Sequence, residues 1–246
     1  MILKRKIYKK LLEWKNECQG KKALLIEGAR RIGKSTICEE FGKNEYESYL
    51  LIDFAKKDKE VERYFERYLN DLDTFFMLLQ THFGTKLTER NSLIIFDEVQ
   101  MFPQARAAIK YLVADGRYDY IETGSLISIR ENVKNIVIPS EERNINMYPL
   151  DFEEFAIALE EDLLVEYIKK CFEKREPLER SMHNQAMLLF HQYMLVGGMP
   201  MPVVAFIESK KDFTEPDKEK RDILKLYRED IMKIDMRYRS KVLAIY

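Results

Sequence analysis

One loop combines glycine, lysine and hydroxyl side chains at a spacing suited to binding phosphate. Residues 28–36 read GARRIGKST, which fits the pattern GxxxxGK[ST]. A short apolar run ends at Glu27, and a helical pattern begins near Gly33. A strand–loop–helix of this kind aims backbone N–H groups and the positive end of the helix dipole at one point. The sequence therefore predicts a P-loop that binds a nucleoside triphosphate with magnesium.

Each residue type in this loop has a predicted part in holding phosphate. The two glycines permit the turn and the close approach of backbone to phosphate. Lys34 is expected to reach the β and γ phosphates, and Ser35 to supply a hydroxyl ligand to magnesium. Arg31 is an unusual charge in such a loop and could contact phosphate or a partner subunit. The predicted nucleotide-binding residues here are Gly28, Ala29, Arg30, Arg31, Ile32, Gly33, Lys34, Ser35 and Thr36.

Two adjacent carboxylates follow a buried strand further along the chain. Residues 92–97 read SLIIFD, and Glu98 comes next. Ligands of open α/β sheets bind outside the carboxyl ends of the strands, where these acids are expected. Asp97 can orient magnesium directly or through water, and Glu98 is placed to polarise a water for attack on the γ phosphate. The alternative is a hydrated strand end without catalytic work.

The next apolar strand ends in the sequence ETGS, at residues 122–125. A hydroxyl there can hydrogen-bond the γ phosphate or the attacking water. We favour Ser125 for this role, followed closely by Thr123. The alternative role is a cap for the following helix, and the two roles are compatible.

Apolar runs alternate with helical patterns over residues 1–150, which indicates an α/β domain with a parallel sheet covered on both faces. Strands are predicted at residues 23–27, 49–53, 92–97, 118–123 and either 136–138 or 145–148. Helices are predicted at residues 3–19, 58–83 and 105–115, besides the helix that follows the P-loop.

A second, helical domain is predicted for residues 151–246, because the patterns after Pro149 are helical with no strand between them. Helical spacing covers residues 151–175 and 180–196. The sequence VGGMP at residues 196–200 interrupts it, a further helical stretch and a charged segment at 208–220 follow, and a helix then runs to about residue 238.

Bulk properties exclude several classes of protein. Charged residues make up 34% of the chain but leave a net charge of -1, which disfavours a general nucleic-acid coat or a polybasic membrane anchor. Three cysteines without a CxxC pair suggest neither a disulfide framework nor a zinc site. The basic start of the chain lacks the apolar stretch of a signal peptide, and no apolar run is long enough to span a bilayer. We expect a cytoplasmic protein without a membrane partner.

A P-loop, an Asp-Glu pair and a polar residue at the next strand end together resemble the AAA+ class of ATPases. More closely, the chain is similar to bacterial and archaeal predicted AAA ATPases, neighbours of the signal-transducing STAND group. The resembling stretches read GARRIGKST, LIIFDEVQMFP, TGS, YPLDFEEF and VGGMP. Such proteins usually continue into a domain of unknown function that would begin near residues 227–231. The resemblance therefore implies a chain truncated or naturally shortened soon after that point.

The resemblance also implies further features of fold and site. It implies a five-stranded parallel sheet in the order 5-1-4-3-2. The VGGMP segment is similar to the glycine-proline motif of STAND ATPases, which would place Pro200 near the adenine; its simpler reading is a helix stop. A basic residue that reaches the γ phosphate is expected, with Arg143 and Arg130 as candidates.

The leading functional prediction is a Mg²⁺-dependent ATPase that uses ATP binding and hydrolysis to switch the relation between its domains. A small-molecule or nucleoside kinase is the second, with Arg130, Arg143 and Glu141-Glu142 read as a lid. A non-hydrolysing, DNA-associated regulator is the third, supported only by the basic residues between Lys4 and Lys10, whose simpler reading is a solvated helix face. ATP and ADP are the expected ligands; self-association, a protein partner and DNA are possible further partners.

Overall fold

The computed structural model describes residues 1–125 and 141–232. The chain divides into two units, one of them running from Arg5 to Tyr148. The other takes in Met1–Lys4 together with the chain from Pro149 onward. The sequence placed a domain boundary at residue 150, and it did not foresee that the first four residues join the later unit.

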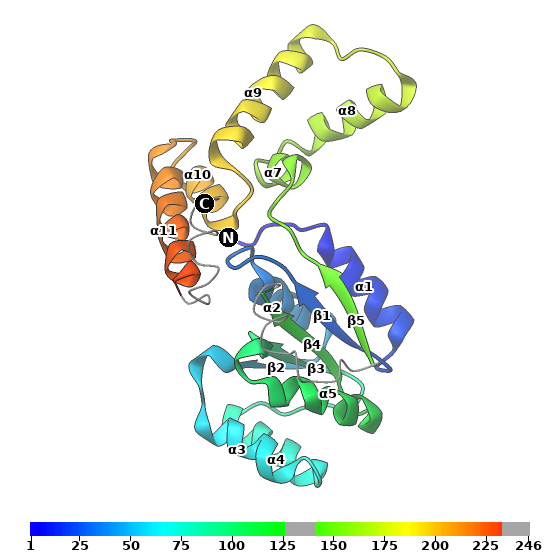
Figure 1. The fold of residues 1–246 in the computed structure, drawn as a ribbon. Coiled ribbons are helices and arrows are strands. Elements are labelled where there is room, and N and C mark those ends of the chain that lie inside the picture. Colours follow the sequence, from blue (N-terminus) through cyan, green and yellow to red (C-terminus); the bar gives the residue numbers. More distant parts are fainter. Residues whose placement is uncertain (126–140, 233–246) are drawn as a thin grey trace. The chain divides into compact units, whose positions relative to one another are not determined.

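A parallel sheet forms the centre of the Arg5–Tyr148 unit, in the order β2-β3-β4-β1-β5 (Figure 1). This is the predicted order read from the opposite edge, so the prediction is confirmed. The strands pair in parallel throughout. Their bounds are β1 (Ala23–Glu27), β2 (Ser48–Asp53), β3 (Ser92–Asp97), β4 (Asp119–Gly124) and β5 (Glu142–Asn146).

The sequence left two positions open for the fifth strand, and the structure describes one of them. β5 overlaps the second alternative, residues 145–148, and begins earlier, at Glu142. Residues 136–138, the first alternative, lie outside the described part of the chain. The strand was hard to recognise because its sequence, ERNIN, is largely polar and three of its five residues are exposed at the sheet edge.

Helices cover both faces of this sheet. α1 (Ile7–Cys18) packs on α2 (Lys34–Glu45), and α2 packs on the sheet. On the other face, residues of α3 (Lys59–Tyr68), α4 (Leu72–Phe83) and α5 (Pro103–Asp115) share one core with the strands. The single tryptophan, Trp14, is 1% exposed and lies beside Phe41. The helix faces that pack in the core are those that the spacing of apolar residues predicts.

Two predicted helices are in fact pairs of helices. Residues 58–83 form α3 and α4, because the Asp71 side chain accepts a hydrogen bond from the Thr74 N–H and starts a new helix. Residues 151–175 form α7 (Phe152–Ala158) and α8 (Asp162–Lys174), separated where Glu160 adopts a left-handed conformation. The N-terminal helix begins at Ile7 rather than at Leu3, whose side chain joins the core of the other unit.

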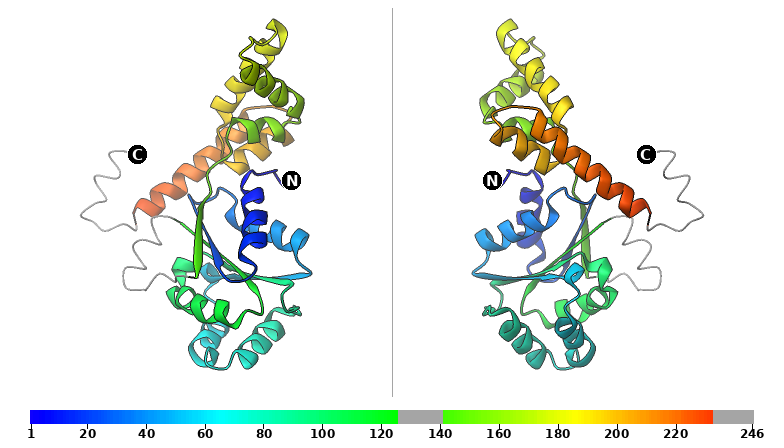
Figure 2. Two further views of the ribbon diagram at one scale, coloured as in Figure 1. Left: turned by 90° about the vertical axis from the view of Figure 1, so that its right-hand side faces the viewer. Right: turned by 90° about the vertical axis from the view of Figure 1, so that its left-hand side faces the viewer.

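The second unit is helical in every element that the structure describes. α9 (Arg180–Val196) has the predicted bounds, and α10 (Pro200–Glu208) follows the VGGMP break. The predicted charged segment and final helix merge in part, because α11 starts at Thr214 and runs to Ile231. The turned views of Figure 2 draw this segment, in orange to red, as one continuous helix. Within the described residues, no helix is long and apolar enough to cross a membrane.

A buried ionic cluster ties α5 to β4 and β5. Arg106 donates two hydrogen bonds to Glu142, at 2.9 and 3.2 Å, and their side chains are 3% and 1% exposed. Glu122 is fully buried and accepts no hydrogen bond from any described residue. Burial, with the negative charge of Glu142 beside it, raises the pKa of Glu122 well above its ordinary value. This raised pKa favours the protonated form of Glu122, which can donate to Glu142.

This cluster predicts a pH dependence of stability. Since the pKa of Glu122 is raised in the folded state, its contribution is full below about pH 4.5 and is lost as the pH rises through the folded-state pKa. The Glu122→Gln side chain keeps a neutral hydrogen-bond donor at every pH, so its contribution to stability does not fall as the pH rises. We expect the variant to be more stable than the natural chain at pH 7, by about 1 kcal/mol or more, and nearly equal at pH 4. Urea unfolding followed by Trp14 fluorescence measures both.

Glu66→Gln, at an exposed position of α3, is the control and should leave the pH profile unchanged. If Glu122→Gln and the natural chain lose stability in parallel between pH 4 and pH 7, Glu122 is ionised in the folded protein and this assignment is wrong.

Candidate functional site

The P-loop connects β1 to α2 and has a tightly determined backbone. Arg31 and Gly33 adopt positive φ angles of 65° and 89° on either side of Ile32. A Cβ atom at Gly28 would lie 2.4 Å from the Met147 carbonyl oxygen, so only glycine fits at the start of the loop. Glycine is thus required once for close approach and once for the turn into the helix.

Lys34 begins α2 and is buried, with 5% of its surface exposed. Its ammonium donates to the carbonyl oxygens of Gly28 and Ala29, at 3.1 and 2.9 Å. Burial lowers its pKa, while the charges of Glu98 and Asp97 act in the opposite direction. The ammonium is therefore held over the loop by weak acceptors, which phosphate oxygens can replace with stronger, charge-assisted bonds.

Asp97 lies at the end of β3 and meets two hydroxyl groups. The Ser35 hydroxyl is 2.8 Å from both carboxylate oxygens of Asp97 and donates to them. The Thr123 hydroxyl donates to Asp97 as well. These bonds join the first turn of α2 to β3 and β4, so the predicted magnesium ligands Ser35 and Asp97 lie side by side.

Glu98 has an unusual backbone conformation for a side chain of its kind. Its φ and ψ angles are 53° and 47°, in the left-handed region. Its N–H donates to the Thr123 hydroxyl oxygen at 3.2 Å, and its carboxylate accepts a hydrogen bond from the Gln100 amide. The surrounding residues thus hold Glu98 in a strained conformation, a feature that clusters at functional sites.

Thr123, the second choice in the sequence for the polar residue of β4, is the one with contacts to both acids. Ser125, the first choice, follows the strand end and is nearly buried. Its proposed contact with phosphate remains a prediction. Gln100 was missed altogether, although its place two residues after Glu98 is within reach of a side-chain contact.

The other predicted loop residues differ in exposure. Ala29, Arg30 and Arg31 are exposed, Ile32 is buried, and Thr36 is exposed on the first turn of α2. The loop thus presents two arginine side chains to solvent. Their contact with phosphate or a partner stays a prediction.

Of the two arginines proposed to reach the γ phosphate, the structure describes Arg143 alone. Arg143 is the second residue of β5, level with Leu24 near the start of β1, and pairs with Glu17 at 2.6 Å. It therefore lies toward the end of the strands opposite the P-loop. Arg130 lies outside the described residues.

Pro200 belongs to the second unit, where it is the first residue of α10. Proline suits this position because the N–H it lacks would have no partner in the helix. The preceding Gly198 accepts a hydrogen bond from the Leu150 N–H at 2.7 Å, and a Cβ atom on it would meet the Leu150 carbonyl. This accounts for the break locally, and the contact of Pro200 with adenine remains a prediction.

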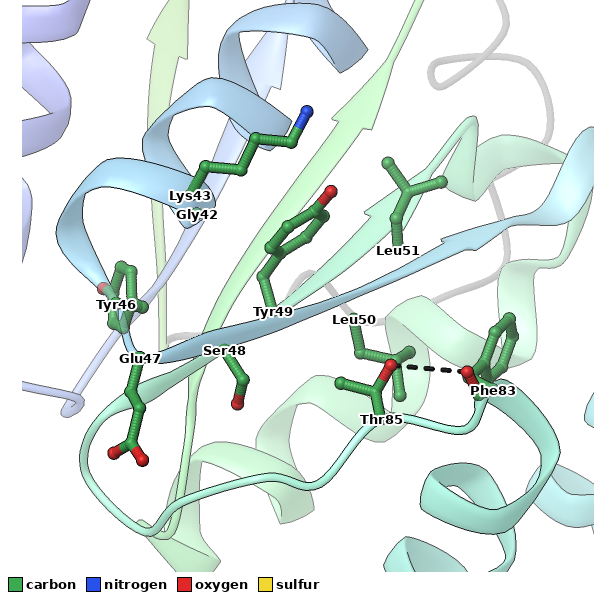
Figure 3. Close-up of a pocket in the computed structure, with 10 residues that line it drawn as sticks. All are labelled: Gly42, Lys43, Tyr46, Glu47, Ser48, Tyr49, Leu50, Leu51, Phe83 and Thr85. Atoms are coloured by element: carbon green, nitrogen blue, oxygen red, sulfur yellow. Dashed lines mark hydrogen bonds between the residues drawn. The ribbon is translucent and has the colours of Figure 1, made fainter.

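A hollow of about 560 Å³ lies in the Arg5–Tyr148 unit, at the edge strand β2. Figure 3 shows Tyr49 and Leu51 on one side of the strand and Leu50, Phe83 and Thr85 on the other. No P-loop residue lines this hollow. The candidate site is thus defined by its residues and not by this cavity.

The two side chains that could bind magnesium suffice only if a bound nucleotide supplies further oxygen ligands. Among the described residues, no group of three or more His, Cys, Asp and Glu side chains could hold a metal ion. Ser35 and Asp97 offer one hydroxyl and one carboxylate. Mg²⁺ typically completes such a set with water and the phosphates of a nucleotide, which is the arrangement that the P-loop favours.

The fold and these contacts define the class of protein. A parallel sheet in this order, with a P-loop between β1 and α2, is that of a P-loop NTPase. The chain belongs to the AAA domain family, whose model matches residues 20–156. The predicted resemblance to AAA ATPases is therefore confirmed at the level of the family.

Two solved structures match the chain at low identity. A structure of C. elegans PCH-2 is 10% identical, with a TM-score of 0.43, over 83% of this chain and 63% of that one. A structure of the Aeropyrum pernix ORC1 protein in complex with DNA is 9% identical, with a TM-score of 0.38, over 80% and 68%. The present chain thus spans less than two thirds of the PCH-2 chain. No curated protein matches it.

The position of Thr123 predicts a magnesium-specific effect. Thr123→Val keeps the shape of the side chain but leaves Asp97 and the Glu98 N–H short of one partner each. We expect the free energy of unfolding to fall by about 1–3 kcal/mol. We also expect weaker binding of a fluorescent ATP analogue with Mg²⁺, and little change when the metal is chelated.

Ser92→Ala is the matched control, since it removes a buried, hydrogen-bonded hydroxyl from the start of β3, at the end of the strand opposite Asp97. A loss of Mg²⁺-dependent binding as large in Ser92→Ala as in Thr123→Val would show that Thr123 has no special role.

Proposed function

We propose that this chain binds ATP with Mg²⁺, hydrolyses it to ADP and phosphate, and uses the bound nucleotide as a conformational switch. The observation that supports this most is the hydrogen-bonded set Ser35–Asp97–Thr123–Glu98 at the strand ends, beside the Lys34 ammonium. A protein that only binds nucleotide has no evident need for the second carboxylate, Glu98, in this set.

Binding would use groups that are already oriented. The N–H groups of the loop and of the first turn of α2 would donate to a common anion. Lys34 would exchange the Gly28 and Ala29 carbonyls for β- and γ-phosphate oxygens. Ser35 would bind Mg²⁺ directly, and Asp97 would orient the metal through a water or bind it. Magnesium would supply charge neutralisation of the phosphates.

Hydrolysis would begin with Glu98 as general base. Its carboxylate would accept a proton from a water whose oxygen forms the new bond to the γ phosphorus. The bond between the γ phosphorus and the bridging oxygen would break, and ADP would leave with that electron pair. Glu98 must exchange the Gln100 amide for this water, so a slow rate in the isolated chain is part of the proposal.

Phosphate release from ATP with Mg²⁺ tests the assignment. Glu98→Gln should lower turnover about 100-fold or more while ATP still binds, because the amide cannot accept the proton. Lys34→Ala should weaken ATP binding itself. Lys43→Ala is the matched control: this exposed lysine lies on the same helix and pairs with Glu39, so its loss should change neither quantity.

Two results would oppose this reading. If Glu98→Gln turns over at the natural rate, Glu98 is not the base. If ATP binds but no phosphate is released at any protein concentration, hydrolysis by this chain alone is excluded.

The kinase alternative loses two of its lid residues. Glu142 is buried in the ion pair with Arg106, and Arg143 pairs with Glu17 toward the opposite end of the strands. Phosphate found in an acceptor and not in solution would still favour it.

The DNA-associated alternative retains exposed lysines at the start of α1, namely Lys6, Lys9 and Lys10. Arg5, counted in the same basic cluster, binds backbone carbonyls of its own unit. DNA binding that weakens steeply with salt would support the alternative, and its absence at low salt would remove it.

A further inference from the structure

The guanidinium of Arg5 bonds to two separate segments beside the candidate site. One nitrogen donates to the Ile32 carbonyl at 2.9 Å, and another donates to the Tyr148 carbonyl at 2.6 Å. The three residues are far apart in sequence but belong to one unit. A planar guanidinium with fixed donor directions can hold two acceptors at once, which an ammonium does less well.

The first of these bonds fixes the orientation of a peptide inside the P-loop. Ile32 stands between Arg31 and Gly33, both of which have positive φ angles. Its carbonyl directly precedes Gly33 and Lys34, where α2 begins and its free N–H groups are expected to meet phosphate. A rotation of this peptide would therefore change the direction in which the N–H groups at the start of α2 point.

The second bond fixes the chain as it leaves β5. The Met147 N–H donates to the Glu27 carbonyl at 2.8 Å, and the Met147 carbonyl packs against Gly28. Tyr148 comes next. The segment that Arg5 holds is thus continuous with the wall of the P-loop.

Arg5 and Tyr148 also mark the two places where the chain passes between the units. Lys4 and Pro149, their neighbours in sequence, belong to the other unit, and Leu3 is part of its core. Both covalent connections therefore begin at residues joined by one guanidinium, which also holds the P-loop.

We propose that Arg5 is a positioning residue that couples the nucleotide state of the P-loop to the two connections between the units. The proposal rests on the switch described above and names the residue through which the switch acts. Phosphate that reorients the Ile32 peptide would alter the hold of Arg5 on Tyr148. The connections would then favour a different arrangement in the ATP state and in the ADP state.

A distance measurement between the units tests this. Spin labels at Lys110→Cys on α5 and Lys174→Cys on α8, both exposed, report one distance per nucleotide state. Cys18→Ser removes the half-buried thiol, and Cys38 and Cys171 are buried. Glu98→Gln in the same background holds ATP unhydrolysed. The states compared are nucleotide-free, ADP with Mg²⁺ and ATP with Mg²⁺.

We expect the natural Arg5 chain to show different distances with ATP and with ADP. Arg5→Met should still bind nucleotide, more weakly, and should give one distance in both states. Its ratio of ATP to ADP affinity should fall by roughly 5-fold or more, because coupling between sites is reciprocal. Arg5→Lys should restore part of the difference in distance. Arg63→Met, which removes an exposed guanidinium on α3, should leave the full difference.

The outcomes separate the two proposals. If the Arg5 chain binds both nucleotides without a change in distance, the switch itself fails. If the Arg5 chain responds and Arg5→Met responds equally, the coupling role of Arg5 is wrong. If Arg5→Met loses nucleotide binding and thermal stability together, and Arg5→Lys restores neither, Arg5 supports the fold only and the inference is overturned.

Discussion

The carboxylate of Asp97 joins three elements of the Arg5–Tyr148 unit, and the geometry of the candidate site depends on it. Hydroxyl groups from α2 and β4 both donate to this one side chain at the end of β3. The arrangement is possible because parallel strands place their carboxyl ends at the same edge of the sheet. Asp97 is nearly buried, so an unpaired charge there would be costly. The two hydroxyl bonds therefore stabilise the acid and orient it at the same time.

A second set of buried charges acts on the register of the sheet. Arg106 on α5 binds Glu142 at the start of the edge strand β5, with Glu122 on the same face. A slip of β5 by one residue would turn Glu142 to the opposite face and leave a buried guanidinium without its partner. This matters because β5 is short and largely polar, and its exit, at Met147 and Tyr148, forms one wall of the P-loop. An ion pair at the start of β5, at the opposite end of the strand from Met147, thus helps to determine where that wall lies.

The sequence predicted the parts of the fold that follow from local patterns. Continuous apolar runs identified β1 and β3, and the helical spacing of apolar residues identified α5 and α9, because burial on both faces or on one stripe is visible in residue order. The polar edge strand β5 was only half recognised, because a strand with an exposed edge needs little apolar surface. The break between α3 and α4 was missed because both halves keep helical spacing, and only the cap at Asp71 separates them.

The candidate site was predictable to the same extent. The P-loop and the Asp-Glu pair are contiguous in sequence, so residue types and spacing reveal them. The sequence ranked Ser125 above Thr123 for a contact with phosphate or water, and that ranking stays a prediction. The register pairs Phe96 with Glu122, which puts Thr123 level with Asp97 and explains its contacts. Arg5 could not be found in this way, since its partners lie 27 and 143 residues away and only the folded chain brings them together.

The hydroxyl of Thr123 makes the two acids dependent on each other. It donates to Asp97 and accepts from the N–H of Glu98, whose left-handed backbone conformation is costly for a residue with a Cβ atom. Any displacement of Asp97, such as one that a metal ion would cause, therefore changes the acceptor that holds the Glu98 backbone. The Glu98 carboxylate also accepts a hydrogen bond from the Gln100 amide, which must break before the carboxylate can move. Under the proposed mechanism, a shift that begins at Ser35 and Asp97 would therefore reach Glu98 through the Thr123 hydroxyl.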